Sequence, residues 1–376
     1  MSASSILSLG MSWFTEEPGG LNRMYAGLHA ALAARDVTVN GLITGTPSLA
    51  GPVPRGISFV APRNAPLLTR WSAFRRSVRA GRGDADVVAA HFAVYALPVL
   101  DQLKDRKFVF HFHGPWARES RQERESAVAV TAKRWVEGRV YRRADRCIVL
   151  SRAFAGVLAR DYNVDPARIH VIPGGVDVAR FEAEVSRRDC RDRLGLPQDR
   201  PLIGTVRRLV HRVGLELLID AMEAVRSRVP DALLLVAGTG PLAAALAARV
   251  AERGLGDHVR FLGYVADEKL PALYRACDLT VVPSVALEGF GLTTIESLAS
   301  GTPVLVTPVG GLPETVEGLD PDLVLANESV DVIAETIVKA LRRPETLPSP
   351  SACREHARRN NDWSIIASRT LSVYES

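Results

Sequence analysis

The chain has 376 residues, of which 47% are hydrophobic, 24% are charged and only 6% are aromatic. This composition excludes a disordered or low-complexity chain, and the length predicts two domains, because a domain usually holds about 100–200 residues. The formal net charge of +5 at pH 7 permits an anionic ligand or an anionic surface and demands neither.

Short apolar runs alternate with longer stretches of helical periodicity, which is typical of βαβ units around a parallel sheet. A first series predicts strands at Ser5–Leu9, Val37–Ile43, Val87–Ala90, Phe108–His113, Cys147–Leu150 and Ile169–Ile172, with helices at Leu21–Ala34 and Ala127–Arg143. A second series predicts strands at Pro201–Val206, Leu233–Ala237, Val259–Leu262, Leu279–Val282 and Val304–Val306. We therefore expect an α/β protein with two Rossmann-like domains.

Between the two series, the turn Pro173–Asp177 and the charged stretch Arg180–Arg200 have the character of a linker. They predict an N-terminal domain of residues 1–183 and a C-terminal domain of residues 184–359. The tail Asn360–Ser376 predicts a final amphipathic helix, because its apolar residues recur at helix-like intervals. These residues are Trp363, Ile365, Ile366, Leu371 and Tyr374.

The sequence carries no signal for export, membrane insertion or a structural metal. Its first ten residues lack the cationic segment and the apolar run of a secretory signal, and no apolar run approaches the roughly 20 residues that span a bilayer. The four cysteines are scattered without the spacing of a zinc site or a disulfide framework. We therefore expect a cytoplasmic protein without a bound metal. The cysteines are Cys147, Cys190, Cys277 and Cys353.

The segment Leu287–Glu296 follows a predicted strand and leads into a predicted helix that ends near Gly301. Gly289 and Gly291 allow backbone N–H groups to approach a ligand closely, and the positive end of the helix dipole suits a phosphate. Glu296 lies inside the helix, where it can accept hydrogen bonds from a diol, and Glu288 lies in the loop. The alternative is a common strand-to-helix turn with two solvated glutamates.

The segment Gly204–Gly214 follows the first predicted strand of the second domain and is rich in arginine. Ligands of open α/β sheets bind beyond the carboxyl ends of strands, so Arg208 and Arg212 are placed to clamp a diphosphate with forked hydrogen bonds. For Arg207 we favour a solvated side chain. A run of solvated arginines at a helix start is the alternative for the whole segment.

Two further segments lie at predicted strand ends in the first domain. Gly19 and Gly20 precede the first helix and permit backbone approach to a ligand, although such a turn is a weak signal. His111 and His113 alternate onto one face of a strand, but no third ligand at metal-site spacing accompanies them. We therefore expect His113 to hydrogen-bond a substrate, and both His111 and His91 to be structural.

Taken together, these segments resemble the retaining family 4 glycosyltransferases of the GT-B fold along nearly the whole chain. Glu288 and Glu296 are similar to the E-x7-E motif of that family, and further similar segments follow or precede them in the family's order. These segments are Ile172–Asp177, Ala237–Pro241, Ala299–Val304 and Gly310–Glu314. The resemblance implies two Rossmann-like domains whose parallel sheets face an interdomain cleft, and a C-terminal helix that crosses back to the first domain.

The resemblance also implies a role for each candidate residue. Glu296 would hold the ribose hydroxyls, Glu288 would contact the donor sugar, and Arg208 would bind the diphosphate. The family places a lysine directly before the glycine at position 214, whereas this chain has Val213 there, so Arg212 is the nearby cation that would take its place. The remaining implied donor contacts are Gly19 and Gly20 at the phosphates, His113 near the anomeric centre, and the backbone of Gly289, Phe290, Gly291 and Leu292 at the sugar.

The activity that the resemblance implies is transfer, with retention, of a hexosyl or N-acetylhexosaminyl group from a nucleoside diphosphate sugar to a hydroxyl acceptor. UDP is the favoured base and GDP the second, and neither a cofactor nor a metal is expected. The acceptor stays open between a glycan, a lipid-linked molecule and a small molecule.

Several alternatives use the same residues differently. A nucleotide-sugar epimerase, a phosphorylase or a nucleotide-binding protein without transferase activity fits the same fold. The segment Gly238–Ala243 matches G-x-G-x-x-A and allows a dinucleotide-dependent oxidoreductase, although the expected acidic partner is missing. The arginines of Arg75–Arg82 and Arg139–Arg146 lack interleaved aromatic residues, so we expect no nucleic acid. The segment Trp71–Arg79 has the apolar and basic residues for peripheral contact with an anionic membrane at its inner face.

Overall fold

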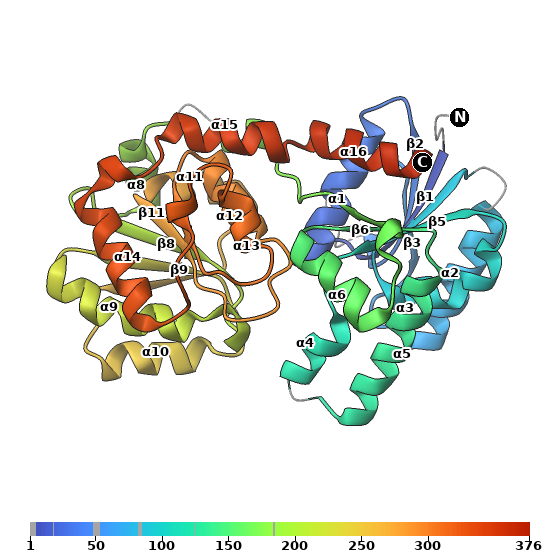
Figure 1. Ribbon diagram of the computed structural model, residues 1–376, viewed down its shortest axis with the longest axis horizontal. Helices are drawn as coiled ribbons and strands as arrows, with labels where there is room; N and C mark the ends of the chain where they lie inside the picture. Colours follow the sequence, from blue (N-terminus) through green and yellow to red (C-terminus); the bar gives the residue numbers. More distant parts are fainter. Residues whose placement is uncertain (1–4, 18, 48–52, 82–84, 124, 183–184) are drawn as a thin grey trace. The chain divides into compact units, whose positions relative to one another are not determined.

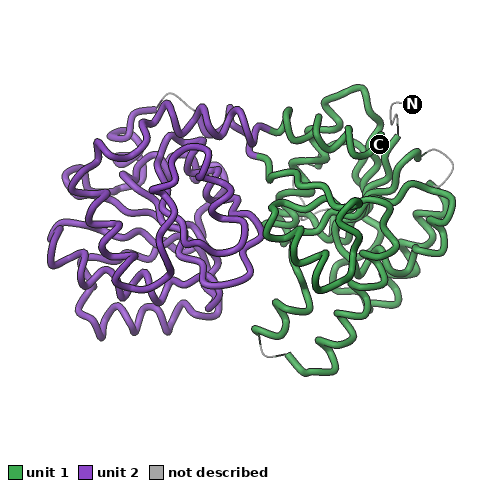
Figure 2. The backbone as a smooth tube through the Cα atoms, in the orientation of Figure 1, with its two compact units in different colours: residues 1–175, 363–376 green, residues 176–362 purple. Residues whose placement is uncertain are grey.

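The computed structural model describes the chain except for residues 1–4, 18, 48–52, 82–84, 124 and 183–184. The chain forms two compact units, which Figure 2 distinguishes by colour. Unit 1 consists of residues 1–175 and Trp363–Ser376, and unit 2 consists of Val176–Asp362. The boundary expected at residues 183 and 184 lies outside the described residues, and the units divide between Gly175 and Val176.

Unit 1 is built on a seven-stranded sheet in the order β3-β2-β1-β4-β5-β6-β7, with every neighbouring pair parallel (Figure 1). Its strands are β1 Ser5–Ser12, β2 Thr38–Thr44, β3 Ile57–Ala61, β4 Val87–Ala90, β5 Lys107–Phe112, β6 Arg146–Val149 and β7 Ile169–Val171. Its main helices are α1 Gly20–Ala33, α2 Leu67–Gly81, α3 Ala93–Ala96, α4 Trp116–Gln122, α5 Ala127–Arg143, α6 Arg152–Tyr162 and α16 Trp363–Glu375. The strand order reverses between β1 and β4, which is where open α/β sheets bind ligands.

Unit 2 is built on a five-stranded parallel sheet in the order β10-β9-β8-β11-β12. Its strands are β8 Leu202–Val206, β9 Leu233–Ala237, β10 Val259–Gly263, β11 Leu279–Val282 and β12 Val304–Val306. Its main helices are α7 Val178–Phe181, α8 Arg187–Leu194, α9 Leu215–Arg228, α10 Ala243–Glu252, α11 Leu270–Ala276, α12 Leu292–Ala299, α13 Leu312–Val316, α14 Val330–Arg342 and α15 Pro350–Asn361. The expected α/β fold with two parallel sheets is confirmed.

Local sequence explains where these elements begin and how they are buried. Strands β4 and β11 consist of Val, Ala, Leu and Thr and are buried at every position, as expected for parallel strands covered on both faces. Serine caps begin several helices, because the side-chain oxygen accepts a hydrogen bond from an N–H group three residues later. Ser151, Ser329 and Ser349 cap α6, α14 and α15 in this way.

Strand β3 was not predicted from the sequence. This strand lies at the edge of the sheet and pairs only with β2. Of its five residues only Ala61 is fully buried, and prolines and glycines surround it in the sequence, including Pro54, Gly56 and Pro62. An edge strand with little buried surface does not need a long apolar run, so its pattern is weak.

The C-terminal helix belongs to unit 1, as expected, but it begins later than expected. Helix α15 extends to Asn361, Asp362 has an extended backbone conformation, and α16 begins at Trp363. Asn and Asp are poor helix formers, which explains the break inside the expected segment 360–376. Ile366, Ala367 and Tyr374 of α16 are buried in the unit 1 core.

Among the helices of the described chain, none has the length and apolar character needed to cross a membrane.

Candidate functional site

The loops that follow the strands of unit 2 pack against each other through their backbones. Gly310 has φ +59°, and a Cβ atom there would lie 1.9 Å from the backbone oxygen of Glu288. Gly214 has φ +73°, and a Cβ atom there would lie 2.0 Å from the backbone oxygen of Pro283. These glycines therefore bring residues 207–214, 283–291 and 307–312 together at the carboxyl ends of β8, β11 and β12.

Glu288 lies in this loop cluster as a buried carboxylate with a cationic partner. Its Oε2 atom accepts hydrogen bonds from Arg207 Nη2 and from Ser284 Oγ, the latter at 2.9 Å. The exposed fractions of the Arg207 and Glu288 side chains are 9% and 12%. Burial alone would raise the pKa of Glu288, but the charges of Arg207 and Arg212 outweigh it and hold this pKa below its usual value. Glu288 is therefore ionised at pH 7.

Glu296 lies on α12, which starts directly after this loop. Gly291 caps the helix with φ +91°, a conformation that favours glycine. The Tyr274 hydroxyl donates a 2.8 Å hydrogen bond to Glu296 Oε2. Tyr274 is buried and Glu296 is half-buried. The tyrosine therefore fixes one carboxylate oxygen, in the region where the sequence analysis expected a diol ligand.

The three arginines after β8 differ in their surroundings. Arg208 is exposed, whereas Arg212 donates a 3.3 Å hydrogen bond from Nη1 to the backbone oxygen of Leu287. Arg207, which we expected to be solvated, is instead buried against Glu288, so that expectation is wrong. Val213, at the position of the family lysine, is buried with 2% exposure. Neighbouring arginines look alike in the sequence, and only the fold decides which one turns inward.

The structure also explains the G-x-G-x-x-A match. A Cβ atom on Gly238 would lie 1.9 Å from the backbone oxygen of Arg207, and one on Gly240 would lie 2.4 Å from that of Leu209. Leu209 N–H donates a 3.0 Å hydrogen bond to the Thr239 carbonyl between them. Both glycines thus allow close packing of protein backbone, which accounts for the pattern without a dinucleotide.

In unit 1, the glycine turn expected to contact phosphate begins α1. Gly19 is the N-cap residue and Gly20 the first helical residue, and both are exposed. The buried Asn22 side chain holds the preceding loop: its Nδ2 donates to the Glu17 carbonyl at 2.9 Å, and its Oδ1 accepts from Ser12 N–H at 3.3 Å. Asn22 was not among the residues predicted from the sequence, although an Asn two residues after a Gly-Gly pair is a recognisable turn-stabilising residue.

The histidines of unit 1 form a stack at the ends of β4 and β5. The rings of His91 and His111 are parallel within 10°, with their centroids 4.2 Å apart. His91 Nδ1 lies 2.9 Å from His113 Nε2, and His111 Nε2 lies 2.7 Å from the Tyr374 hydroxyl of α16. The Nδ1 atom of His113 is buried without a hydrogen-bond partner among the described residues. His113 therefore has one ring nitrogen held by His91 and a second that is not satisfied.

Burial makes these histidines poor bases. Burial, together with the neighbouring His113, lowers the pKa of His111 to about 3, and burial lowers the pKa of His113 to about 4. All three rings are neutral at pH 7, because burial and its histidine neighbours hold the pKa of His91 well below the usual value too. In the part of the chain that the structure describes, no group of three or more His, Cys, Asp or Glu residues could hold a metal ion.

The segment Trp71–Arg79, expected to present a membrane-binding face, lies within α2 and uses its apolar residues internally. Phe74 and Val78 are buried in the unit 1 core, and Phe74 stacks on Tyr95 with centroids 4.5 Å apart. Arg75 pairs with Asp101. Phe74 and Val78 are therefore not available for contact with lipid. Peripheral membrane contact stays a prediction, which sedimentation with anionic vesicles at low salt would test.

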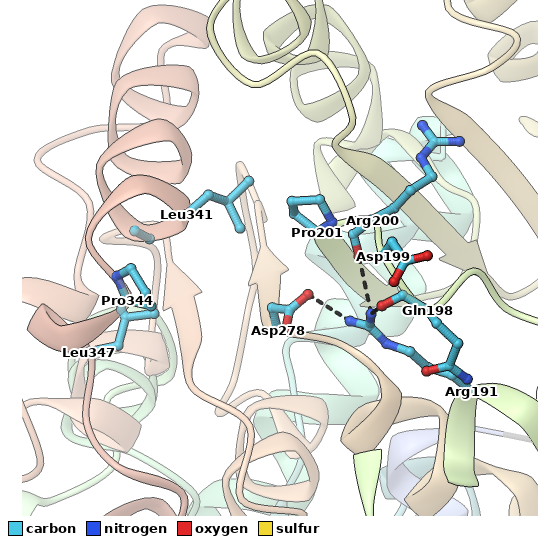
Figure 3. Close-up of a pocket in the computed structure, with 10 residues that line it drawn as sticks. Arg191, Gln198, Asp199, Arg200, Pro201, Asp278, Leu341, Pro344 and Leu347 are labelled. Atoms are coloured by element: carbon cyan, nitrogen blue, oxygen red, sulfur yellow. Dashed lines mark hydrogen bonds and ion pairs between the residues drawn. The ribbon is translucent and has the colours of Figure 1, made fainter. Parts of the chain in front are cut away.

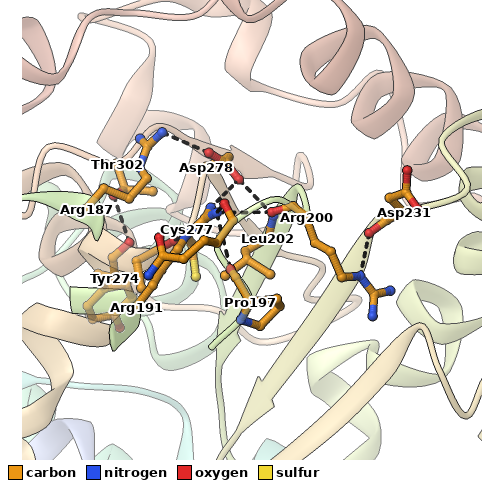
Figure 4. Close-up of polar contacts among 12 residues, drawn as sticks. Arg187, Arg191, Pro197, Arg200, Leu202, Asp231, Tyr274, Cys277, Asp278 and Thr302 are labelled. Carbon is orange, nitrogen blue, oxygen red and sulfur yellow. Dashed lines mark hydrogen bonds and ion pairs between the residues drawn. The ribbon is translucent and has the colours of Figure 1, made fainter. Parts of the chain in front are cut away.

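A pocket of about 300 Å³ lies at the amino ends of the unit 2 strands, beside the residues that precede β8 and β11 (Figure 3). The loop cluster described above follows the carboxyl ends of these strands. Arg191 lines this pocket, and its guanidinium is bonded to other protein groups (Figure 4). It donates hydrogen bonds to the carbonyls of Ala276 at 2.9 Å and Gln198 at 2.7 Å, and it forms an ion pair with Asp278 at 2.7 Å. Because the donors of this buried arginine are taken up by protein groups, we do not assign a ligand to this pocket.

Two family models together match most of the chain. The model described as "Glycosyltransferase Family 4" matches residues 18–180, and the model described as "Glycosyl transferases group 1" matches residues 186–360. The two matches meet near the boundary between the two structural units.

Sequence relatives and solved structures agree with these models. The chain is 34% identical over 277 residues to the 2-deoxystreptamine glucosyltransferase of Streptomyces kanamyceticus, covering 70% of each protein. It is 35% identical over 255 residues to the D-inositol 3-phosphate glycosyltransferase of Salinispora arenicola, covering 63% of this chain and 56% of that protein. Its structure superposes with a TM-score of 0.79 on sucrose-phosphate synthase from Thermosynechococcus elongatus, at 25% identity, covering 99% and 98% of the two chains.

A further structural neighbour is Alr3699/HepE of Anabaena, solved in complex with UDP and glucose. It has a TM-score of 0.81 and 21% identity, and the match covers 99% of each chain. Together with the two parallel sheets, these matches establish that the chain belongs to the family 4 glycosyltransferases and has their GT-B fold.

Proposed function

We propose that this glycosyltransferase moves a hexosyl or N-acetylhexosaminyl group from a nucleoside diphosphate sugar to a hydroxyl acceptor, with retention and without a metal. The observation that carries the proposal is the loop cluster of unit 2. There, a buried ionised Glu288, a half-buried Glu296 and the glycine-rich start of α12 follow one another at the carboxyl ends of parallel strands. Retention rests on the resemblance of Glu288 and Glu296 to the family motif.

Each candidate residue has a chemical task in this proposal. Glu296 accepts hydrogen bonds from the ribose hydroxyls, and Glu288 accepts them from the donor sugar. Arg208, Arg212 and the backbone N–H groups of residues 289–292 stabilise the charge that develops on the leaving diphosphate. This charge compensation is the reason that the proposal includes no metal.

The unit 1 residues of the proposal are Gly19 and Gly20 at the phosphates and His113 at the sugar. The buried Nδ1 of His113 has no hydrogen-bond partner among the residues that the structure describes, which supports a hydrogen-bonding role. The lowered pKa of His113 argues against a role as a cationic acid at neutral pH. In the proposed reaction the acceptor hydroxyl attacks the anomeric carbon, the bond to the diphosphate oxygen breaks, and the departing phosphate takes the acceptor proton. No protein base is then needed.

UDP is the favoured donor base and GDP the second. Structural neighbours are described in complex with UDP and with UDP-glucose, whereas a relative from Mycobacterium tuberculosis, 33% identical over 211 residues, is named as a GDP-mannose-dependent mannosyltransferase. These names support a nucleotide-sugar donor and leave the choice of base to experiment. The relatives described above are named as glycosyltransferases, so no observation favours the epimerase alternative.

Calorimetry and thermal unfolding with UDP, GDP, ADP, dTDP and their glucose or mannose conjugates, with and without EDTA, test the proposal. A ligand that binds only the folded state raises its stability by about 2.7 kcal/mol at 100 times the dissociation constant. We expect one base to bind selectively, with EDTA making no difference, and at least tenfold weaker binding to Glu296→Ala.

Glu335→Ala is the matched control, because Glu335 is an exposed glutamate on a helix of the same unit; its affinity should equal that of the wild type. Hydrolysis or transfer of the bound sugar separates a transferase from a protein that only binds nucleotides. If no nucleotide or nucleotide sugar binds to the wild type, the proposal is wrong.

A further inference from the structure

Arg207 has no role in the proposed function, whereas its neighbours Arg208 and Arg212 do. It nevertheless contacts several residues of the candidate donor loop. Its Nη2 atom donates to Glu288 Oε2 and, at 3.0 Å, to Ser284 Oγ, and its Nη1 atom lies 3.3 Å from Thr293 Oγ1. Ser284 lies just after β11, and Thr293 lies in the first turn of α12. One guanidinium therefore connects the end of β8 to both sides of the candidate donor loop.

These contacts leave one Glu288 oxygen uncommitted. Arg207 and Ser284 both bond to Oε2, and no hydrogen bond from the described residues reaches Oε1. The carboxylate is thus held in one orientation through a single oxygen. Glu288 Oε1 can then accept a hydrogen bond from a sugar hydroxyl in a fixed direction.

Charge adds a second reason for Arg207. A buried carboxylate without a cation is strongly unfavourable, and removing one partner of a buried ion pair leaves the other uncompensated. The family lysine is absent, because Val213 occupies its position and is buried. Arg212 directs its hydrogen bond to the Leu287 carbonyl, so Arg207 is the arginine that contacts the Glu288 carboxylate.

We propose that Arg207 is a positioning residue of the donor site: its guanidinium holds Glu288 Oε2 and the start of α12, so that Oε1 is presented to a hydroxyl of the donor sugar. This inference rests on the proposed function, because it assigns the sugar to Glu288. It goes beyond that function in giving the orienting task to an arginine to which the proposed function assigns no contact with the donor.

The functional test compares nucleotide with nucleotide-sugar binding in Arg207→Met and Arg207→Lys. The probes are UDP and UDP-glucose, with GDP and GDP-mannose as a second pair. We expect Arg207→Met to weaken binding of the sugar conjugate at least tenfold and of the nucleotide alone less than threefold, because only the sugar uses Glu288. Arg207→Lys should recover part of the loss, because it keeps a cation but not the fork.

Arg343→Met is the control for replacing an arginine that forms an ion pair. Arg343 lies in the same unit and pairs with Glu345, and both side chains are 67% exposed, so both affinities should match the wild type. Equal loss of nucleotide and sugar conjugate in Arg207→Met, or no loss of either, would overturn the inference.

A second measurement needs no ligand. Without Arg207, Glu288 should take up a proton as the pH falls, so the drop in melting temperature caused by Arg207→Met should be smaller at pH 5 than at pH 8. With Glu288→Gln in the background, the drop should be the same at both pH values. If the drop in melting temperature caused by Arg207→Met does not depend on pH in either the wild-type or the Glu288→Gln background, Arg207 does not stabilise the charge of Glu288. That result would refute the inference.

The two measurements also separate this inference from the proposed function. If the wild type binds no nucleotide sugar, the proposed function fails, whatever the melting experiment shows. If the wild type binds a sugar nucleotide and Arg207→Met binds it equally well, the proposed function stands and the role of Arg207 is refuted.

Discussion

Buried titratable side chains occur in both units, and their surroundings have opposite effects on charge. Glu288 is buried beside Arg207 and stays ionised. His111 and His113 are buried among rings, with no acidic partner in the contacts that surround them, and lose their protons far below neutral pH. Both outcomes follow from one rule: a charge moves out of water only where an opposite charge replaces its hydration.

The buried histidines predict how stability depends on pH. Their pKa values are lowered in the folded protein, whereas an unfolded histidine has a pKa of about 6.5. Between about pH 6.5 and pH 4 the unfolded chain therefore binds more protons than the folded one. Above this range the histidines do not reduce the free energy of unfolding. Within the range, the free energy of unfolding decreases as the pH is lowered, by up to about 1.4 kcal/mol per pH unit for each histidine.

His111→Gln removes one such group and keeps a side chain that can bond to the Tyr374 hydroxyl. We expect the wild type to lose about 1–2 kcal/mol more than this variant between pH 6.5 and pH 5, measured by urea unfolding at each pH. His211→Gln is the control, because the His211 side chain is 83% exposed. Equal pH slopes for the wild type and His111→Gln would contradict the prediction.

At the scale of elements, loops rather than strands carry the candidate site, and glycines decide how closely those loops pack. Gly310 is the sharpest case, since it combines φ +59° with a Cβ position 1.9 Å from the Glu288 backbone oxygen. Gly311 N–H also donates to that oxygen at 3.0 Å. The conformation of the Glu288 loop thus depends on a residue 22 positions later in the chain. The reason is that the two loops follow the carboxyl ends of the neighbouring strands β11 and β12.

Gly310→Ala should therefore cost about 2–3 kcal/mol of unfolding free energy, from backbone strain and from the displaced Glu288 loop. Nucleotide-sugar affinity should fall in the same variant, because Glu288 shifts. Gly256→Ala is the matched control, since a Cβ atom there meets nothing within 4 Å and Gly256 has no positive φ. Denaturant unfolding and calorimetry check both parts, and a Gly310→Ala protein as stable as Gly256→Ala would show that the loops can separate without cost.

At the scale of the whole molecule, the chain leaves unit 1 after Gly175 and returns to it at Trp363. Trp363 fits against two glycines, because a Cβ atom on Gly27 would lie 2.2 Å from its ring and one on Gly175 would lie 2.4 Å from it. Further along α16, the Tyr374 hydroxyl bonds to His111. The C-terminal helix is therefore part of the unit 1 core and also reaches the histidine stack.

Removing residues 363–376 should destabilise unit 1 selectively. The truncation exposes the apolar side chains that Ile366, Ala367 and Tyr374 cover. We expect the free energy of unfolding of unit 1 to fall by about 5 kcal/mol or more, which is comparable to the total stability of many domains. Hydrogen exchange should show lost protection in β1 and β5 and retained protection in β8 and β9. Arg369→Ala, an exposed position on the same helix, should leave both patterns unchanged; protection of β1 in the truncated protein would contradict the prediction.

The sequence by itself determined the fold class, the family and eleven of the twelve strands that the described residues form. These features depend on local signals: the length of apolar runs, helical periodicity, and glycines at strand ends. The weak edge strand β3 and the break between α15 and α16 carried little of that signal. Which of the predicted residues contact a donor stays a prediction.

Only the tertiary structure decided which buried groups are partners. Arg207 and Glu288 are 81 residues apart in the chain, and His111 and Tyr374 are 263 apart. From the sequence we expected Arg207 to be solvated, because neighbouring arginines carry the same pattern. We also expected Phe74 and Val78 to lie on a free apolar face, although both are buried in the unit 1 core. Burial and charge pairing depend on contacts between distant segments, and these exist only once the sheets have formed.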